Sequence, residues 1–111
     1  MDQPETLAFE ALNTALRAAA EPTRLRILGL LTEAELTVTD FTDILLQSQP
    51  RISRHLKLLT EAGLVERARE GSWAFFRLPD GTPQARLVQT MVGWLDAADP
   101  VVAHDRERLA A

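Results

Sequence analysis

Residues 48–63 constrain the fold more than any other stretch, because they combine a helix start, a helix stop and one apolar stripe. The hydroxyl of Ser48 can accept a hydrogen bond from the otherwise unpaired amides of a first helical turn. Pro50 is tolerated in that turn, and Gly63 supplies the left-handed residue at which many helices end. Between these signals the apolar positions repeat at i, i+4 and i+7, namely Ile52, Leu56 and Leu59. The stretch therefore predicts one bounded helix with one buried face.

The other face of this predicted helix is cationic, and basic residues continue into the next segment. Residues 64–70 and 73–78 are two short runs with β-branched and aromatic side chains, and a turn around Gly71 separates them. A cationic helix followed at once by a basic hairpin is the order of a winged helix-turn-helix. In that fold the helix enters the major groove of DNA and the hairpin reaches phosphates.

Residue chemistry divides the expected DNA contacts into two groups. Amide, hydroxyl and guanidinium groups can read base edges, whereas other basic and polar side chains position the sugar-phosphate backbone. We expect base contacts from Gln49, Ser53 and Arg54, and backbone contacts from Ser48, Arg51, His55, Lys57, Arg67 and Arg69. For His55 we expect a structural or phosphate-contacting role and not a catalytic or metal-binding one, since no partner acid or second ligand has suitable spacing.

The remaining segments predict further helices. Residues 5–19 are amphipathic, and residues 22–32 are apolar around most of a helix, which indicates a central position. A third helix starts at Thr37, and a last one runs from Thr82 and Pro83 to a stop at residues 99–100. The predicted fold class is mainly α with a small β-hairpin wing (α+β). We expect a domain over residues 1–99, followed by a charged tail or the start of a linker over residues 100–111.

The last predicted helix carries two adjacent apolar stripes, which together cover about half its circumference. One stripe can close the core of the domain, and the second indicates a partner copy, which we expect to pack there and on the first helix. The alternative is that both stripes are buried within one subunit. The expected dimer contacts are Phe9, Leu12, Leu16, Leu87, Met91, Trp94 and Leu95.

Composition limits the possible functions of the chain. The formal net charge of −4 opposes nucleic-acid binding, but residues 51–77 contain six basic and three acidic residues. Charge alone thus permits DNA binding and equally permits a merely solvated face. The sequence has no signal-peptide pattern and no apolar run long enough for a membrane span, so we expect a cytoplasmic protein without a membrane partner. No acid pair, nucleophile with a base, or glycine-rich phosphate loop appears, so we expect no enzyme activity and no cofactor.

Three segments in register resemble the ArsR/SmtB family of bacterial transcriptional repressors: residues 21–31 (EPTRLRILGLL), 48–59 (SQPRISRHLKLL) and 61–65 (EAGLV). The match extends over residues 7–95. The resemblance implies a homodimeric winged helix that occupies an inverted-repeat operator in double-stranded DNA and leaves it when an effector binds. The rival hypothesis is a winged-helix module that dimerises or docks on a protein without binding DNA.

The chain departs from that family at its metal sites. Metal-sensing members have a Cys-Val-Cys box where this chain has Thr37, Val38 and Thr39, and hydroxyls do not replace thiolates as ligands for soft metals. Of the Asp, His and Glu ligands of the family's second metal site, the corresponding region offers a single histidine, His104. A non-metal effector is therefore expected. The sequence also resembles modules that precede a methyltransferase-like domain, which implies an effector similar to S-adenosylhomocysteine.

Overall fold

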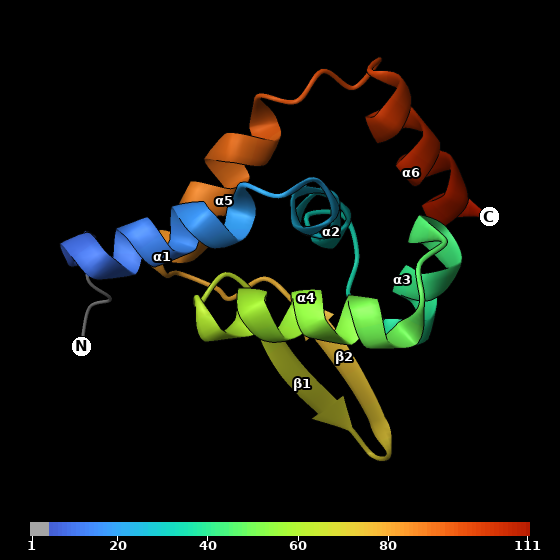
Figure 1. Cartoon of the computed structure of the whole chain (residues 1–111), viewed down its shortest axis with the longest axis horizontal. Helices are drawn as coiled ribbons and strands as arrows, with labels where there is room; N and C mark the ends of the chain where they lie inside the picture. The colour runs from blue at the N-terminus through green and yellow to red at the C-terminus, as the bar shows by residue number, and fades with distance from the viewer. Residues whose placement is uncertain (1–4) are drawn as a thin grey trace.

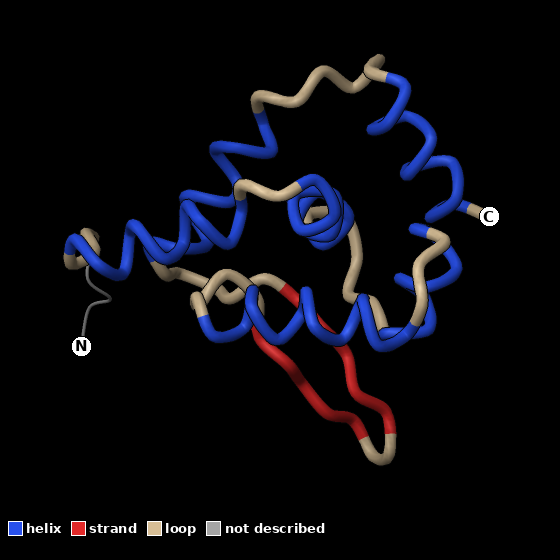
Figure 2. The backbone as a smooth tube through the Cα atoms, viewed as in Figure 1, coloured by secondary structure: helices blue, strands red, loops and turns tan. Residues whose placement is uncertain are grey.

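The computed structural model describes residues 5–111, which form six helices and one two-stranded hairpin (Figures 1 and 2). Helices α1 and α2 precede the helix-turn-helix pair α3 and α4, the strands β1 and β2 form the wing, and α5 and α6 follow. Their bounds are α1 Phe9–Ala19, α2 Pro22–Leu31, α3 Val38–Leu45, α4 Gln49–Glu61, β1 Glu66–Glu70, β2 Trp73–Arg77, α5 Pro83–Gly93 and α6 Pro100–Ala110. The predicted fold class, mainly α with a small hairpin wing, is confirmed.

Helix α2 lies at the centre of the molecule and is seen end-on in Figure 1, with other helices around it. Its side chains at Ile27, Leu28, Leu30 and Leu31 are buried, as expected from its nearly continuous apolar sequence. The buried faces of α1, α3 and α4 pack into the same core, which also contains Phe41 and Phe76. The central position predicted for residues 22–32 is confirmed.

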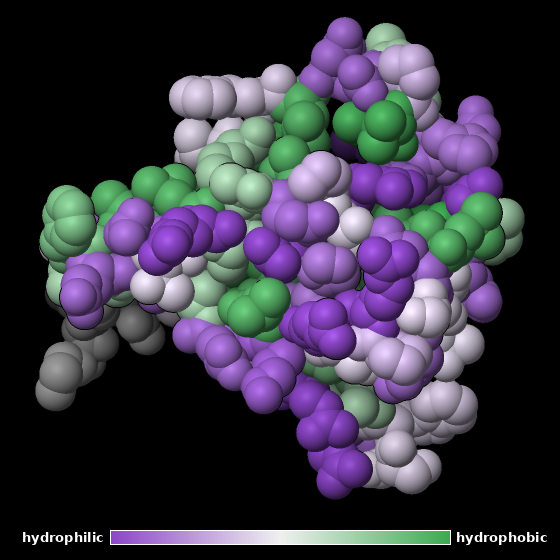
Figure 3. Space-filling view, in the orientation of Figure 1, coloured by the Kyte–Doolittle hydropathy of each residue, from purple (hydrophilic) through white to green (hydrophobic). Residues whose placement is uncertain are grey.

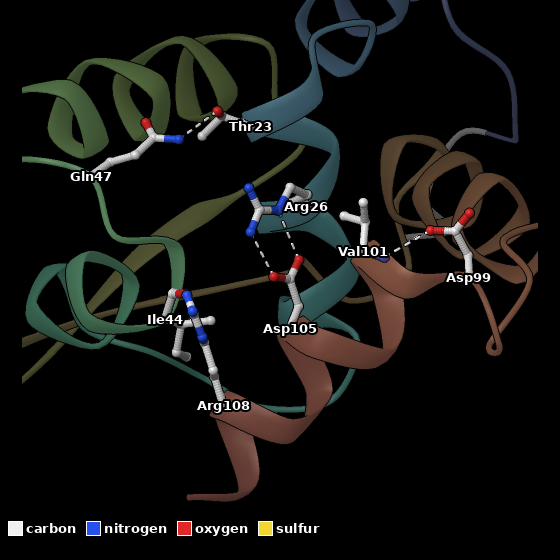
Figure 4. Close-up of polar contacts among 8 residues, drawn as sticks. All are labelled: Thr23, Arg26, Ile44, Gln47, Asp99, Val101, Asp105 and Arg108. Atoms are coloured by element: carbon white, nitrogen blue, oxygen red, sulfur yellow. Dashed lines mark hydrogen bonds and ion pairs between the residues drawn. The ribbon is translucent and has the colours of Figure 1, made fainter.

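Local hydrogen bonds set the start of both helices in the helix-turn-helix. Thr37 and Asp40 form a reciprocal capping box, in which the Thr37 amide donates to the Asp40 carboxylate at 2.9 Å. Ser48 caps α4 by accepting from the Arg51 amide at 3.4 Å. In the turn between them, the Gln47 side-chain amide donates to the buried Thr23 hydroxyl at 2.8 Å (Figure 4). The turn is thereby fixed to α2.

The wing is a regular antiparallel hairpin, and its base is joined to the helical core. Arg67 pairs with Phe76 and Arg69 with Ala74, and Gly71 adopts the left-handed conformation needed at the turn, with φ 61°. At the base, Leu36 and the buried Phe76 exchange backbone hydrogen bonds of 3.1 and 2.8 Å. The base of the hairpin is therefore attached to the helical core, and its turn extends away from the helices, as Figure 1 shows.

The prediction of one last helix up to residue 98 was wrong. Helix α5 ends at Gly93, and residues 94–99 form an irregular connection. Asp99 and Pro100 begin a new helix instead of ending the old one: the Asp99 carboxylate accepts from the Val101 amide at 2.9 Å, and Pro100 is the first residue of α6. The two apolar stripes therefore do not continue onto Trp94 and Leu95 as parts of one helix.

Most of residues 100–111, which we expect from the sequence to be a tail or the start of a linker, forms helix α6 and packs against α2 and α3. Arg26 of α2 holds Asp105 of α6, and the Arg108 guanidinium donates to the Ile44 carbonyl of α3 at 2.9 Å (Figure 4). Leu109 packs against the core from the same side. Within residues 5–111, none of the helices combines the length and the apolar character that a membrane span needs.

Candidate nucleic-acid interface

Helix α4 turns its polar side outward because its apolar stripe is locked into the core. Ile52, Leu56 and Leu59 are almost inaccessible to solvent, which fixes the rotation of the helix about its axis. The expected contact residues Ser48, Gln49, Arg51, Arg54 and Lys57 are all exposed on the remaining surface, and Ser53 is half-buried.

Polar side chains on the exposed face of α4 contact one another along the helix. The Gln49 amide nitrogen donates to the Ser53 hydroxyl at 2.8 Å, so these two predicted base-reading side chains lie together, one helical turn apart. The Lys57 side chain is 76% exposed, and its ammonium lies 3.9 Å from the Glu61 carboxylate, a weak surface pair. Arg54 is also exposed on α4, and a guanidinium can form a bidentate contact with a base.

The wing adds two exposed cations to the interface. Arg67 and Arg69 are two residues apart on β1 and therefore share one face of the hairpin. Arg77 on β2 differs from them, because its guanidinium donates to Glu66 at 2.6 Å, a bond that raises the pKa of Arg77. Directly after the turn, Trp73 is 66% exposed and is not part of the buried core.

His55 lies apart from the exposed row and faces α2. Its side chain is 17% exposed, and its Nδ1 lies 3.2 Å from a guanidinium nitrogen of Arg24 and 3.8 Å from the Glu21 carboxylate. Burial lowers the pKa of His55, although the nearby Glu21 acts to raise it. The neutral ring can therefore accept a hydrogen bond from Arg24, whose Nε also donates to the Ala18 carbonyl at 2.6 Å. This placement favours a structural role for His55 over a phosphate contact.

Glu21 connects the start of α2 with this histidine. Its carboxylate caps α2 by accepting from the Arg24 amide at 2.8 Å. Burial acts to raise the pKa of Glu21, but backbone hydrogen bonds from Arg24 and Thr23, with the nearby charges of His55 and Arg24, outweigh it and leave the pKa lowered. Glu21 is therefore ionised at neutral pH and supports the junction of α2 and α4.

The expected dimer contacts fall into two groups in this single chain. On α1, Phe9 is 86% exposed, and Leu12 and Leu16 are also accessible. After the end of α5, Trp94 and Leu95 are exposed as well. Leu87 and Met91 on α5 itself are partly buried and pack against the core of the same subunit. In the described residues 5–111, the apolar row of Phe9, Leu12 and Leu16 on α1 is thus accessible to solvent.

Residues 37–39, which stand where metal-sensing members have the Cys-Val-Cys box, contribute to the start of helix α3. Thr37 caps α3, and its hydroxyl and amide are both used in the capping box. Throughout residues 5–111, no three His, Asp or Glu side chains gather closely enough to hold a metal ion, and the sequence contains no cysteine.

Comparison with known proteins identifies the family. The sequence pattern described as "Bacterial regulatory protein, arsR family" matches residues 21–67. The arsenic resistance transcriptional regulator ArsR1 of Pseudomonas putida is 41% identical over 96 residues, which cover 85% of this chain and 73% of that protein.

Among solved structures, the transcriptional repressor BigR of Xylella fastidiosa has a TM-score of 0.72 at 28% identity, over 81% of this chain and 88% of that one. A homodimeric winged helix-turn-helix DNA-binding domain of Mycobacterium bovis, described as a possible ArsR-family regulator, has a TM-score of 0.67 at 28% identity. The match covers 74% of this chain and 75% of the Mycobacterium bovis chain. The chain belongs to the ArsR family of bacterial winged helix-turn-helix proteins, which are DNA-binding transcriptional repressors and not enzymes.

Proposed function

We propose that this protein is a homodimeric repressor that reads an inverted-repeat operator with α4 and holds the DNA backbone with its wing. The observation that carries this proposal is the outer face of α4, where Gln49, Arg51, Arg54 and Lys57 are exposed while the apolar stripe fixes the helix in the core. Arg67 and Arg69 extend the cationic surface onto the wing. Basic side chains placed on a helix and a neighbouring hairpin match the groove and phosphate contacts of duplex DNA.

The proposed roles follow from side-chain chemistry and accessibility. Gln49, Ser53 and Arg54 read base edges, because amide and guanidinium groups form specific pairs with adenine and guanine in the major groove. Ser48, Arg51, Lys57, Arg67 and Arg69 hold phosphates. His55 positions α4 on α2 through Arg24 and Glu21 and does not touch DNA.

The proposed dimer joins two copies through α1 and the end of α5. The exposed side chains of Phe9, Leu12 and Leu16 form an apolar row that a soluble monomer would leave in water. The related domain from Mycobacterium bovis is described as homodimeric. A two-fold dimer would present two α4 helices to the two halves of an inverted repeat.

The proposed effector is not a metal bound through thiolates. The similar protein from Pseudomonas putida is named for arsenic resistance, yet the 111 residues of this chain contain no cysteine, and Thr37 is committed to capping α3. Hydroxyl groups are poor ligands for soft metals. An S-adenosylhomocysteine-like metabolite, which the resemblance to methyltransferase fusion regulators implies, is one small molecule to test.

Fluorescence anisotropy on the DNA upstream of the protein's own gene, against a scrambled duplex at several salt concentrations, tests this function. We expect preferential binding of two subunits per site, with an affinity that falls steeply as salt increases. A salt-independent interaction, or equally weak binding to the upstream DNA and to duplexes from a genome-wide selection, would favour a winged-helix protein-interaction module instead.

A further inference from the structure

A cavity of about 560 Å³ lies beside the central helix, away from the wing. Its walls come mainly from α2, from the connection between α5 and α6, and from the first turns of α6, with single residues from the ends of α1 and α5. Figure 3 shows a hollow in this region, above α2, where green and purple side chains meet. The volume falls within the range of about 300–1,000 Å³ that is common for small-molecule sites.

The floor and sides of the cavity are mainly apolar. The apolar lining includes Leu25 and Leu30 of α2, Val92 of α5 and Val102 of α6. Gly29 of α2 also lines the cavity, and a Cβ atom added there would meet no heavy atom within 4 Å. The surface of α2 at Gly29 is therefore open to the cavity.

The charged groups at the cavity have an excess of carboxylates. Two of the acids are neutralised by basic side chains that also line the cavity: Asp105 pairs with Arg26, and Glu33 with Arg106. Three further acidic residues are among those that line the cavity, namely Glu21, Asp96 and Asp99. Within residues 5–111, Asp96 and Asp99 form no ion pair and accept hydrogen bonds from the backbone amides of Ala98 and Val101. The cavity is therefore apolar inside and negative at its edge.

Trp94 completes the edge of the cavity with an aromatic ring that is 84% exposed. Trp94 and Leu95 also belong to the surface proposed to face a partner copy, so the cavity lies at the margin of the dimer interface. An indole ring attracts a cation to its face, and it does so most strongly where water is excluded. Aromatic surface next to unpaired carboxylates favours positive ligands over neutral or negative ones.

From this arrangement we propose that the cavity binds an amphipathic organic cation, with its apolar body between α2 and α6 and its charge near Asp96, Asp99 and Trp94. An anion of the same shape would meet the three carboxylates and be repelled. As an effector site, the cavity depends on the repressor function proposed above. Binding of a ligand in the cavity does not depend on that function, so the binding experiment is done without DNA.

The probe for this proposal is tetraphenylphosphonium, and the matched control is tetraphenylborate, which has nearly the same shape and the opposite charge. The chain has two tryptophans, so Trp73→Phe leaves Trp94 as the single fluorophore. We expect saturable quenching of Trp94 by the phosphonium in the intact dimer, and binding of the borate weaker by at least about tenfold.

Two sets of variants locate the probe. Asp96→Asn/Asp99→Asn keeps the hydrogen-bond acceptors, removes two charges, and should weaken phosphonium binding by about tenfold. The charge-matched control Glu35→Gln/Asp43→Asn changes exposed acids outside the cavity and should leave binding unchanged. Gly29→Leu should fill the cavity and abolish quenching, whereas Gly29→Ala should retain it.

Equal affinity for the two ions, or no saturable binding of the phosphonium to the folded protein, would overturn the proposal. Unchanged phosphonium binding in Asp96→Asn/Asp99→Asn would do the same. Circular dichroism shows whether Gly29→Leu is folded. If it is not, the carboxylate variants alone decide the outcome.

Discussion

Arg26 of α2 holds Asp105 of α6 through two parallel hydrogen bonds, from Nε to Oδ2 at 2.9 Å and from Nη2 to Oδ1 at 2.7 Å (Figure 4). The pair joins positions 79 residues apart in sequence, and the side-chain hydrogen bond raises the pKa of Arg26. The two partners differ in accessibility: the Asp105 side chain is 7% exposed and the Arg26 side chain 29%. Loss of the arginine would therefore leave the more buried charge without a partner.

The stability of the fold should respond unequally to the two halves of this pair. Arg26→Met should lower the free energy of unfolding by about 3 kcal/mol, because it leaves a buried carboxylate uncompensated. Asp105→Asn should cost less, about 1–2 kcal/mol, since water reaches the remaining guanidinium. Urea unfolding monitored by circular dichroism measures both. Arg106→Met, which breaks the exposed pair with Glu33, is the control and should cost below about 1 kcal/mol. Equal losses in all three variants would contradict a buried contact between α2 and α6.

The start and end of most helices could be predicted from the sequence because local chemistry determines them. Ser48 caps α4, Thr37 and Asp40 cap α3, and Gly63 is left-handed with φ 77°. The same kind of signal was present at Asp99 and Pro100, but it was interpreted as the end of a helix when it was the start of α6. A Pro preceded by Asp fits both interpretations, and only the packing of α6 on α2 distinguishes them.

The outer face of α4 could be predicted from the sequence. The contacts that hold α4 and α6 on α2, and the cavity, could not. The exposed positions follow from the spacing of Ile52, Leu56 and Leu59 in the sequence. The contact of His55 with Arg24, and that of Arg26 with Asp105, join distant segments. Such contacts depend on how helices cross, which the pattern of a single helix does not specify. The cavity beside α2 has the same origin, because α6 was expected to be a tail.

His55 should make the stability of the protein fall in mild acid. Because burial lowers the pKa of His55 in the fold below its ordinary 6.5, the unfolded chain binds the proton first as the pH falls. The free energy of unfolding should therefore be highest above pH 6.5 and decline as the pH falls below that value toward the lowered pKa. Thermal unfolding from pH 7.5 to 5 should show this decline in the wild type and a smaller one in His55→Asn. His104→Asn, on the exposed side of α6, should retain the full decline. A decline of equal size in His55→Asn would assign the effect to other groups.

The two basic residues on the outer face of α4 should affect DNA binding differently. Arg54→Ala should cost about 1–3 kcal/mol on the operator and much less on a scrambled duplex, as expected for a base contact. Lys57→Ala should weaken both duplexes alike and reduce the slope of affinity against salt by about one, as expected for a phosphate contact. Anisotropy titrations at four salt concentrations separate these outcomes. If Arg54→Ala loses the same affinity on both duplexes, Arg54 does not read a base.

A charge placed in the apolar row of α1 should separate the proposed dimer. Leu12→Glu/Leu16→Glu would bury carboxylates against the partner copy, at a cost of roughly 3 kcal/mol or more in dimer stability. Sedimentation velocity should show monomers at concentrations at which the wild type is dimeric, and operator binding should weaken accordingly. As a control, Thr14→Glu places one carboxylate at an exposed position of α1 outside this apolar row and should remain dimeric. If the double variant still dimerises, the interface lies on another surface.

Glu21 should couple the cavity to the DNA-binding helix, because this residue is among those that line the cavity and its carboxylate lies 3.8 Å from Nδ1 of His55 on α4. A cation in the cavity would compete for that carboxylate and weaken the support of α4. Tetraphenylphosphonium should therefore reduce operator affinity by a factor of about 5–150, and the operator should reduce phosphonium affinity by the same factor. Glu21→Gln keeps an acceptor for the Arg24 amide but removes the charge, so it should decrease this factor. Gly29→Leu, which fills the cavity, should eliminate the effect of phosphonium on operator affinity. An effect that persists in this variant would come from the ionic strength and not from binding in the cavity. A phosphonium that binds the cavity without changing operator affinity would show that Glu21 does not transmit the signal to α4.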